Sequence, residues 1–315
     1  MNLKTLSLLF LILIGIVLII NYMDSKKGRS SFTSELTSFD TTQVTRVYIQ
    51  QKAEQSIELQ KKNYQWTVLQ NGKEYHANSH LINSILIELS HLKADRKAAN
   101  DKSKWGKYQV SDSTGTRIHV KSNHNTLADL YLGKFSFKQA PQQNYQNPNQ
   151  PQGSMISYVR LAEEKEVYAT NSFLAMTLNN QMNQFFDLQM TQIKASDIQS
   201  ISFNYPGDSS FILEKHNQNW QINGLSADSA SVARYLSSIS KVNGQDLSLE
   251  EAETNKTLYS INIKANNRTQ SIDIKAYQSN GTLFFSSSEN NGIFFKDDKN
   301  KLFDKFFISQ QSLIN

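Results

Sequence analysis

The chain has 315 residues, of which 38% are apolar and 19% are charged. This composition excludes a wholly disordered, collagen-like or polytopic membrane protein, and the length predicts about two domains. The absence of cysteine excludes disulfide bridges, thiol nucleophiles and cysteine-ligated metal centres. The net charge of +5 is concentrated in the first 30 residues, which hold four basic residues and one acidic residue. The rest of the chain is nearly neutral, which argues against nucleic-acid binding.

An uncharged apolar segment of eighteen residues spans residues 6–23. A helix of that length is just long enough to cross a membrane, and no small-x-small cleavage site follows it. We therefore predict an uncleaved, single-pass membrane anchor with a basic flank over residues 1–30. The flanking charges mildly favour a cytoplasmic body, whereas the extreme N-terminal position favours export. We predict insertion in the bacterial inner (cytoplasmic) membrane, with the body facing the periplasm or the cell exterior.

The rest of the chain contains one pattern twice. Aligning Trp66 with Trp220 superimposes apolar residues over a long stretch without a gap. The first matched positions are Val44, Val47 and Ile49 with Ile198, Ile201 and Phe203. In each copy apolar and polar residues first alternate, which is typical of half-buried antiparallel strands, and apolar residues then recur every three or four positions, which is typical of an amphipathic helix. Asn78 and Asp228 precede the two helical segments and are good N-cap residues.

The pattern predicts an α+β fold class: an N-terminal transmembrane helix followed by two duplicated units, each an antiparallel sheet with a packed amphipathic helix. The first unit is predicted over residues 31–192 and the second over residues 193–315. The later strands align less closely, with Val159 and Tyr168 falling near Phe284 and Phe294. Each unit closes on an aromatic pair, at residues 185–186 and 306–307.

The first unit contains a run of Gln, Asn and Pro at residues 139–153. Such a segment buries too little apolar surface to offset its ordering entropy, so we predict a solvated loop. A partner-contact loop centred on Tyr145 is the alternative.

No arrangement of residues in the sequence identifies an enzyme. Ser90 and Lys93 have the Ser-x-x-Lys spacing of penicillin-binding serine enzymes, but the companion motifs are missing. His76 and His80 have metal-ligand spacing, with Glu74 nearby, but solvated loop histidines explain them better. We predict no catalytic residue, no cofactor and no metal site.

Six short segments follow one another in a defined order and spacing. They are Trp66 with Ala77-Asn78, KYQVSD at 107–112, LGK at 132–134, YVRL at 158–161, VYA at 167–169 and QFFD at 184–187. Together they resemble the bacterial membrane-anchored family known as domain of unknown function 4340, over most of residues 40–245. The resemblance implies one N-terminal membrane helix, an exported body and an accessory role. Members are often encoded beside ABC-type transporters of the gliding-motility type, and the resemblance supplies no catalytic residue.

We therefore predict a single-pass envelope protein that acts as a non-catalytic accessory or docking module of an ABC-type membrane transport complex, with a membrane protein as its partner. The candidate contact residues are Tyr145, Tyr158 and Arg160. Trp66 and Trp220 are interpreted as structural anchors of the repeat, buried where the helix packs on the sheet. The alternative is a periplasmic small-ligand or glycan-binding protein that uses the cleft between the repeats, with one of these tryptophans exposed.

Overall fold

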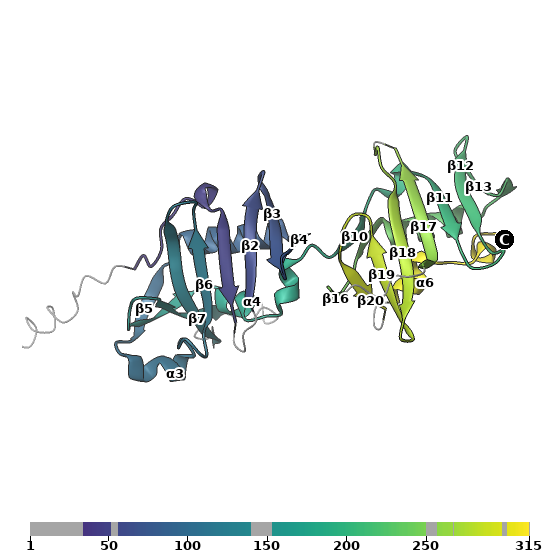
Figure 1. Cartoon of the computed structure of the whole chain (residues 1–315). Helices are drawn as coiled ribbons and strands as arrows, with labels where there is room; N and C mark the ends of the chain where they lie inside the picture. The colour runs from purple at the N-terminus through teal and green to yellow at the C-terminus, as the bar shows by residue number, and fades with distance from the viewer. Residues whose placement is uncertain are drawn as a thin grey trace, which may run out of the picture.

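The computed structural model describes residues 34–51, 56–139, 153–249, 257–266, 268–297 and 301–314. The predicted membrane anchor at residues 1–30 therefore lies outside the described residues, as do Tyr145 and residues 140–152 of the predicted loop. Figure 1 shows the described chain as two halves joined by one stretch that contains β10 (Gln189–Gln192).

The first half is built on a nine-stranded sheet with the order β4-β3-β2-β1-β6-β7-β8-β9-β5, in which every neighbouring pair is antiparallel. Its strands are β1 (Arg46–Gln50), β2 (Ser56–Lys62), β3 (Gln65–Gln70), β4 (Lys73–His76), β5 (Ala94–Ala99), β6 (Thr116–Lys121), β7 (Thr126–Gln139), β8 (Gly153–Leu161) and β9 (Val167–Asn171).

The second half contains a nine-stranded antiparallel sheet with the matching order β14-β13-β12-β11-β17-β18-β19-β20-β16. Its strands are β11 (Ile198–Asn204), β12 (Phe211–His216), β13 (Asn219–Ile222), β14 (Leu225–Ser226), β16 (Asp246–Ser248), β17 (Thr257–Ala265), β18 (Ile272–Ser279), β19 (Thr282–Ser287) and β20 (Phe294–Lys296). A separate pair joins β10 to β15 (Lys241–Asn243).

Apolar and polar side chains alternate along the strands, and the face that carries the apolar ones is the buried face of each sheet. Ile49 lies opposite Ile57 on one side and Ile118 on the other, and all three are buried. In the second half Ile201 is paired in the same way, with Leu213 and Ile263. Because side chains alternate between faces along a strand, the polar residues between these positions point to the other face.

One long amphipathic helix packs on the buried face of each sheet. α2 (Ser79–Ser90) begins after Asn78, whose side chain accepts from Leu81 N at 3.2 Å. α5 (Ser229–Ser240) begins after Asp228, whose side chain accepts from Ser231 N at 2.8 Å. These caps satisfy backbone donors that the first helical turn leaves free.

The remaining helical elements are short. They are α3 (Trp105–Tyr108), α4 (Leu174–Leu178), α6 (Leu302–Phe306) and the 3₁₀ turns η1 (Thr41–Gln43), η2 (Lys102–Lys104), η3 (Met182–Phe185), η4 (Ala195–Asp197) and η5 (Gln310–Leu313).

The fold class predicted from the sequence, an α+β body behind an N-terminal transmembrane helix, is wrong as stated. Strand accounts for 48% of the described structure and helix for only 22%, because each half has nine strands in its sheet and a single helix of more than two turns. No helix among the described residues is both long and apolar enough to cross a membrane. The apolar segment at residues 6–23 is outside that part of the chain.

The strand registers also correct the predicted matches between the later segments. Val159 is paired with Leu132 and Tyr168, and the corresponding position in the second half is Phe285, paired with Ala276 and Phe295. The predicted matches, Phe284 and Phe294, are therefore one residue off. A shift of one residue moves a side chain to the other face of a sheet.

The aromatic pairs at residues 185–186 and 306–307 are not equivalent either. The Phe185 carbonyl accepts from the N-cap residue Asn78 at 2.8 Å, and the same bond in the second half joins Leu313 to Asp228, also at 2.8 Å. Leu313 is thus the counterpart of Phe185, and Phe306, at the end of α6, corresponds to Leu178 at the end of α4.

A buried threonine ties the entering chain to the end of the long helix in both halves. Thr37 Oγ1 donates to the Leu89 carbonyl of α2. Thr191 Oγ1 donates to the Ile239 carbonyl of α5 at 2.6 Å and accepts from Val242 N at 3.1 Å. Carbonyls in the last turn of a helix lack partners within the helix, so each hydroxyl caps a C-terminus inside the core.

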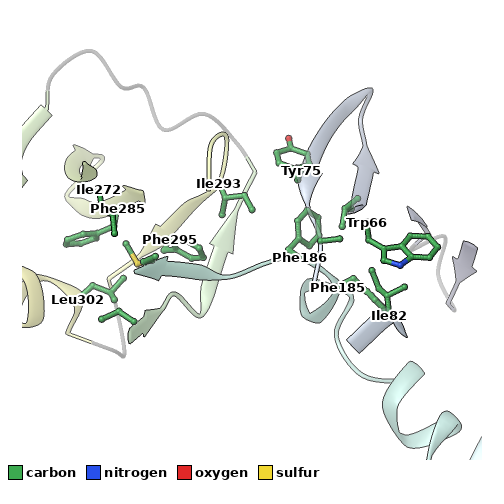
Figure 2. Close-up of a cluster of buried hydrophobic side chains, with 14 of the residues drawn as sticks. Trp66, Tyr75, Ile82, Phe185, Phe186, Ile272, Phe285, Ile293, Phe295 and Leu302 are labelled. Carbon is green, nitrogen blue, oxygen red and sulfur yellow. The ribbon is translucent and has the colours of Figure 1, made fainter. Parts of the chain in front are cut away.

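The stretch that joins the halves is held by both of them. Asp187 N donates to the His76 carbonyl of the first half at 2.9 Å, and the Asp187 carbonyl accepts from Asn290 Nδ2 of the second half. Phe186 packs against Tyr75, with the ring centroids 5.7 Å apart. Figure 2 shows these two rings on one side of the connection and Ile293 on the other.

The double role of Thr191 gives a prediction for stability. In a Thr191→Val variant the shape is kept, but the Ile239 carbonyl and Val242 N lose their partner inside the core. We expect the free energy of unfolding to fall by about 1–3 kcal/mol, measured by urea denaturation. Thr257→Val, at an exposed position of β17, is the control and should change it by less than about 0.5 kcal/mol. Equal losses in the two variants would contradict the role of the hydroxyl.

Candidate functional site

The structure places two of the three predicted contact residues, Tyr158 and Arg160, on the same face of β8, and it buries both. Arg160 is 1% exposed. Its Nε donates to the Val110 carbonyl at 2.9 Å, and its Nη1 donates to the Ala162 carbonyl at 3.0 Å. The guanidinium therefore joins β8 to the chain that follows α3.

The Arg160 guanidinium is also stacked between two aromatic rings. Its Cζ lies 3.9 Å from the ring centroid of Trp105 on α3 and 4.0 Å from that of Tyr131 on β7. Nη2 donates to Asp112 Oδ1 at 2.7 Å, and the Asp112 side chain is 74% exposed. A guanidinium is planar and weakly hydrated, so it can lie between two rings. Asp112 balances its charge where the side chains meet solvent.

These contacts cover the outer face of β7, β8 and β9. Val110, Tyr131, Tyr158, Val167 and Ala169 form a second apolar cluster there, separate from the main core. Burial raises the pKa of the Tyr131 phenol, which keeps it neutral beneath the guanidinium. Figure 1 shows α3 at the end of the first half, beside β5 and β7. This part of the sheet is therefore covered on both faces, by the α3 segment and by the helices of the main core.

A bulge in β7 lies beside the arginine sandwich. Leu132 is opposite Val159, but the next paired residues are Phe135 and Ser157, so β7 carries one extra residue. Gly133 stands in the bulge, where a Cβ would lie 2.0 Å from the Tyr108 carbonyl oxygen. The Gly133 carbonyl accepts from Asn179 Nδ2 at 2.8 Å. Only glycine fits here, which explains the Leu-Gly-Lys segment physically.

The bulge decides which way two phenylalanines point. Without the extra residue, alternation would place Phe135 and Phe137 on the face of the arginine sandwich. With it they lie on the α4 face, and Lys134 instead lies near the Tyr108 and Tyr158 rings, 5.8 Å from each centroid. Phe135 is 48% exposed and Phe137 is 51% exposed.

These two rings lie beside the beginning of α4. Ser157, directly opposite Phe135, donates to the Ser172 carbonyl at 2.9 Å and accepts from Ala175 N at 3.0 Å. Two further exposed apolar side chains belong to this segment: Phe173 (57%), just before α4, and Met176 (45%), within it. We call Phe135, Phe137, Phe173 and Met176 the hairpin surface.

The anchor tryptophans take different environments. Trp66 is 2% exposed, and its Nε1 donates to Asn83 Oδ1 at 3.0 Å. Trp220 is half-buried, and Ala233 stands where α2 has Asn83, so this hydrogen bond has no counterpart. Trp66 is thus unavailable for stacking on a ligand. The alternative of a small-ligand or glycan site between the halves stays a prediction, in which Trp220 would be the stacking residue.

The remaining candidates for chemistry are placed apart. Ser90 is buried and donates to the Ile87 carbonyl at 2.9 Å, an ordinary bond within α2. His76 is at the end of β4 and His80 is in the first turn of α2. In the ranges that the structure describes, no group of three or more His, Asp or Glu side chains is placed to hold a metal ion.

Comparison with known families gives a match over the middle of the chain. Residues 148–262 match the family described as Domain of unknown function (DUF4340). The resemblance to DUF4340 is confirmed. The DUF4340 match includes Arg160, α4, the connection between the halves and β11, while the segments at 107–112 and 132–134 precede it. Comparison with curated proteins and with solved structures gave no match.

The hairpin surface was missed by the sequence analysis. The Lys-Phe-Ser-Phe-Lys run at residues 134–138 alternates clearly, but alternation alone does not say which face meets solvent. That choice depends on the bulge at Gly133, which is fixed by contacts with α3 and α4.

The sandwich around Arg160 gives a second prediction. In Arg160→Lys, one ammonium group replaces a planar fork that serves four acceptors and two rings. We expect the free energy of unfolding to fall by about 2–4 kcal/mol in urea denaturation. Arg46→Lys, at an exposed arginine 4.0 Å from Glu58, is the matched control and should cost less than about 1 kcal/mol. A smaller loss at position 160 than at 46 would contradict the buried arrangement.

The close approach at the bulge gives a third prediction. In Gly133→Ala the new methyl group meets the Tyr108 carbonyl and Val110 Cγ1, so we expect a loss of about 1–3 kcal/mol in unfolding free energy. Gly106→Ala is the control, because a Cβ there meets nothing within 4 Å. Alanine in α3 should be neutral or slightly stabilising. Tolerance of alanine at 133 would show that the backbone contact is not tight.

Proposed function

We propose that this protein is a non-catalytic docking module and that the hairpin surface holds its partner. The observation that carries the proposal is the pair Phe135 and Phe137, two half-exposed rings on one face of a hairpin that reaches beyond its sheet. Single exposed apolar residues are ordinary, but a group on one face is typical of an interaction site. Aromatic residues also dominate the energy of protein interfaces.

The comparison between the halves supports this proposal. The hairpin β18–β19 occupies the equivalent place in the second half, and it closes after Ser279 pairs with Thr282. Its registers run without a shift, and it extends only three residues beyond Ala276, the counterpart of Leu132, whereas β7 extends seven residues beyond Leu132. The equivalent hairpin of the second half is therefore shorter and lacks the bulge.

The rigid base of the hairpin also supports docking. The bulge is held from one face by the α3 segment and from the other by α4, so the two rings are presented in a fixed direction. A surface ordered before binding loses less conformational entropy when a partner arrives.

For the partner we propose a membrane protein of an ABC-type transport complex, with the docking module acting as an accessory subunit on the outer side of the bacterial inner membrane. This finer proposal rests on the resemblance to DUF4340. The proposal specifies the class of the partner, and the crosslinking experiment below can identify the partner itself.

Site-specific photocrosslinking tests the proposal. With p-benzoylphenylalanine at position 137 in the full-length chain in cells, we expect a crosslink to a membrane transport component, identified by mass spectrometry. The same probe at Tyr64, which is 92% exposed in the turn between β2 and β3, is the control and should give no such product. Identical products at the two positions, or none at position 137, would overturn the proposal.

A further inference from the structure

Among the described residues, the extended part of β7 has one edge that no strand covers. β7 pairs with β6 only as far as Leu132, which is opposite Thr116. Beyond the bulge, residues 135–139 pair with β8 on one side, and within the described chain no strand pairs with the other side. We call the unpaired side of residues 135–139 the β7 edge.

An edge of this kind presents hydrogen-bonding groups in a regular row. In an antiparallel sheet, alternate residues direct both N–H and C=O away from the neighbour already paired. About half of the five edge residues therefore offer both groups outward, which is enough to align an added strand.

The side chains flanking the β7 edge differ between its two faces. Phe135 and Phe137 lie on the α4 face, and the cross-strand partner of Phe137 is the half-buried Met155. Lys134 and Lys138 lie on the opposite face. No ion pair joins either lysine to a carboxylate among the residues that the structure covers.

This pattern argues against a second copy of the chain as the occupant. If two β7 edges paired antiparallel about Ser136, Lys134 of each copy would lie opposite Lys138 of the other. Like charges in directly opposed positions destabilise a strand pair. Lysines at an edge are a common protection against such self-association.

We propose that the β7 edge binds an extended segment of the partner as an added strand, with apolar side chains facing Phe135 and Phe137 and acidic side chains facing Lys134 and Lys138. The inference rests on the proposed docking function and adds the partner's chemistry. Backbone bonds fix the segment, and the alternation of apolar and acidic residues gives the selectivity.

Hydrogen exchange with designed peptides tests this inference on the full-length chain. The probe is a twelve-residue peptide that alternates valine with glutamate. We expect it to slow exchange at least tenfold for amides within residues 135–139, measured by mass spectrometry. The same peptide with alternate backbone nitrogens methylated, so that it cannot donate to the edge, should give no protection.

Charge reversal tests the selectivity. A peptide that alternates valine with lysine should protect the wild-type edge at least tenfold less than the glutamate peptide does. Lys138→Glu should narrow or reverse this preference for the glutamate peptide, and it changes an exposed side chain. Ser154→Glu places the same charge on the neighbouring strand of the hairpin, opposite Lys138, and is a second way to lower the preference if Lys138→Glu fails to fold.

The outcomes separate the two proposals. A crosslink at position 137 without peptide protection of residues 135–139 would overturn strand addition and leave docking in place. Protection that rises with protein concentration in the absence of peptide would identify a second copy as the occupant and overturn the acidic partner. If the glutamate and lysine peptides slowed exchange equally, Lys134 and Lys138 would only prevent self-association, and the proposed preference for an acidic partner would be overturned. Absence of both crosslink and protection would overturn both proposals.

Discussion

The backbone contact between Gly133 and the Tyr108 carbonyl is the constraint on which the rest of the candidate site depends. It places one extra residue in β7, and that residue reverses the orientation of every side chain that follows. Phe135 and Phe137 reach solvent beside α4 for this reason. The contact itself requires the α3 segment to be held against the sheet, which is what the buried Arg160 does through Val110 and Trp105.

Attaching a loop through a buried arginine is energetically unfavourable in one respect, because removing the guanidinium from water has a large desolvation cost. The Arg160 guanidinium is buried, but the side chain of its partner Asp112 is 74% exposed and stays hydrated. Only one of the two charges is therefore removed from water. The same guanidinium donates to the Val110 and Ala162 carbonyls. The second half has Ser286 at the equivalent position of its sheet, opposite Lys275, and its hairpin is short and regular. The arginine and the extended hairpin thus occur together in one half only.

The sequence predicted the strands that alternate cleanly and the two capped helices. Val47 and Ile49 in β1 and the segment after Asn78 were read correctly because local pattern and burial agree there. It failed where a register depends on distant contacts: Phe284 was matched in place of Phe285, and Phe306 in place of Leu313. It also left Arg160 among candidate contact residues, because a strand pattern does not reveal that a loop 50 residues earlier supplies its acceptors.

An unpaired edge next to exposed aromatic rings is a risk for any soluble domain, because it can recruit other strands. The β7 edge carries two opposing features: rings that attract an added strand and lysines that repel a copy of the same edge. Charges that serve only as protection would be equally effective with either sign. In the proposed strand addition their positive sign also favours acidic over basic side chains in the incoming strand, so the same lysines would both repel a copy of the edge and select among partners.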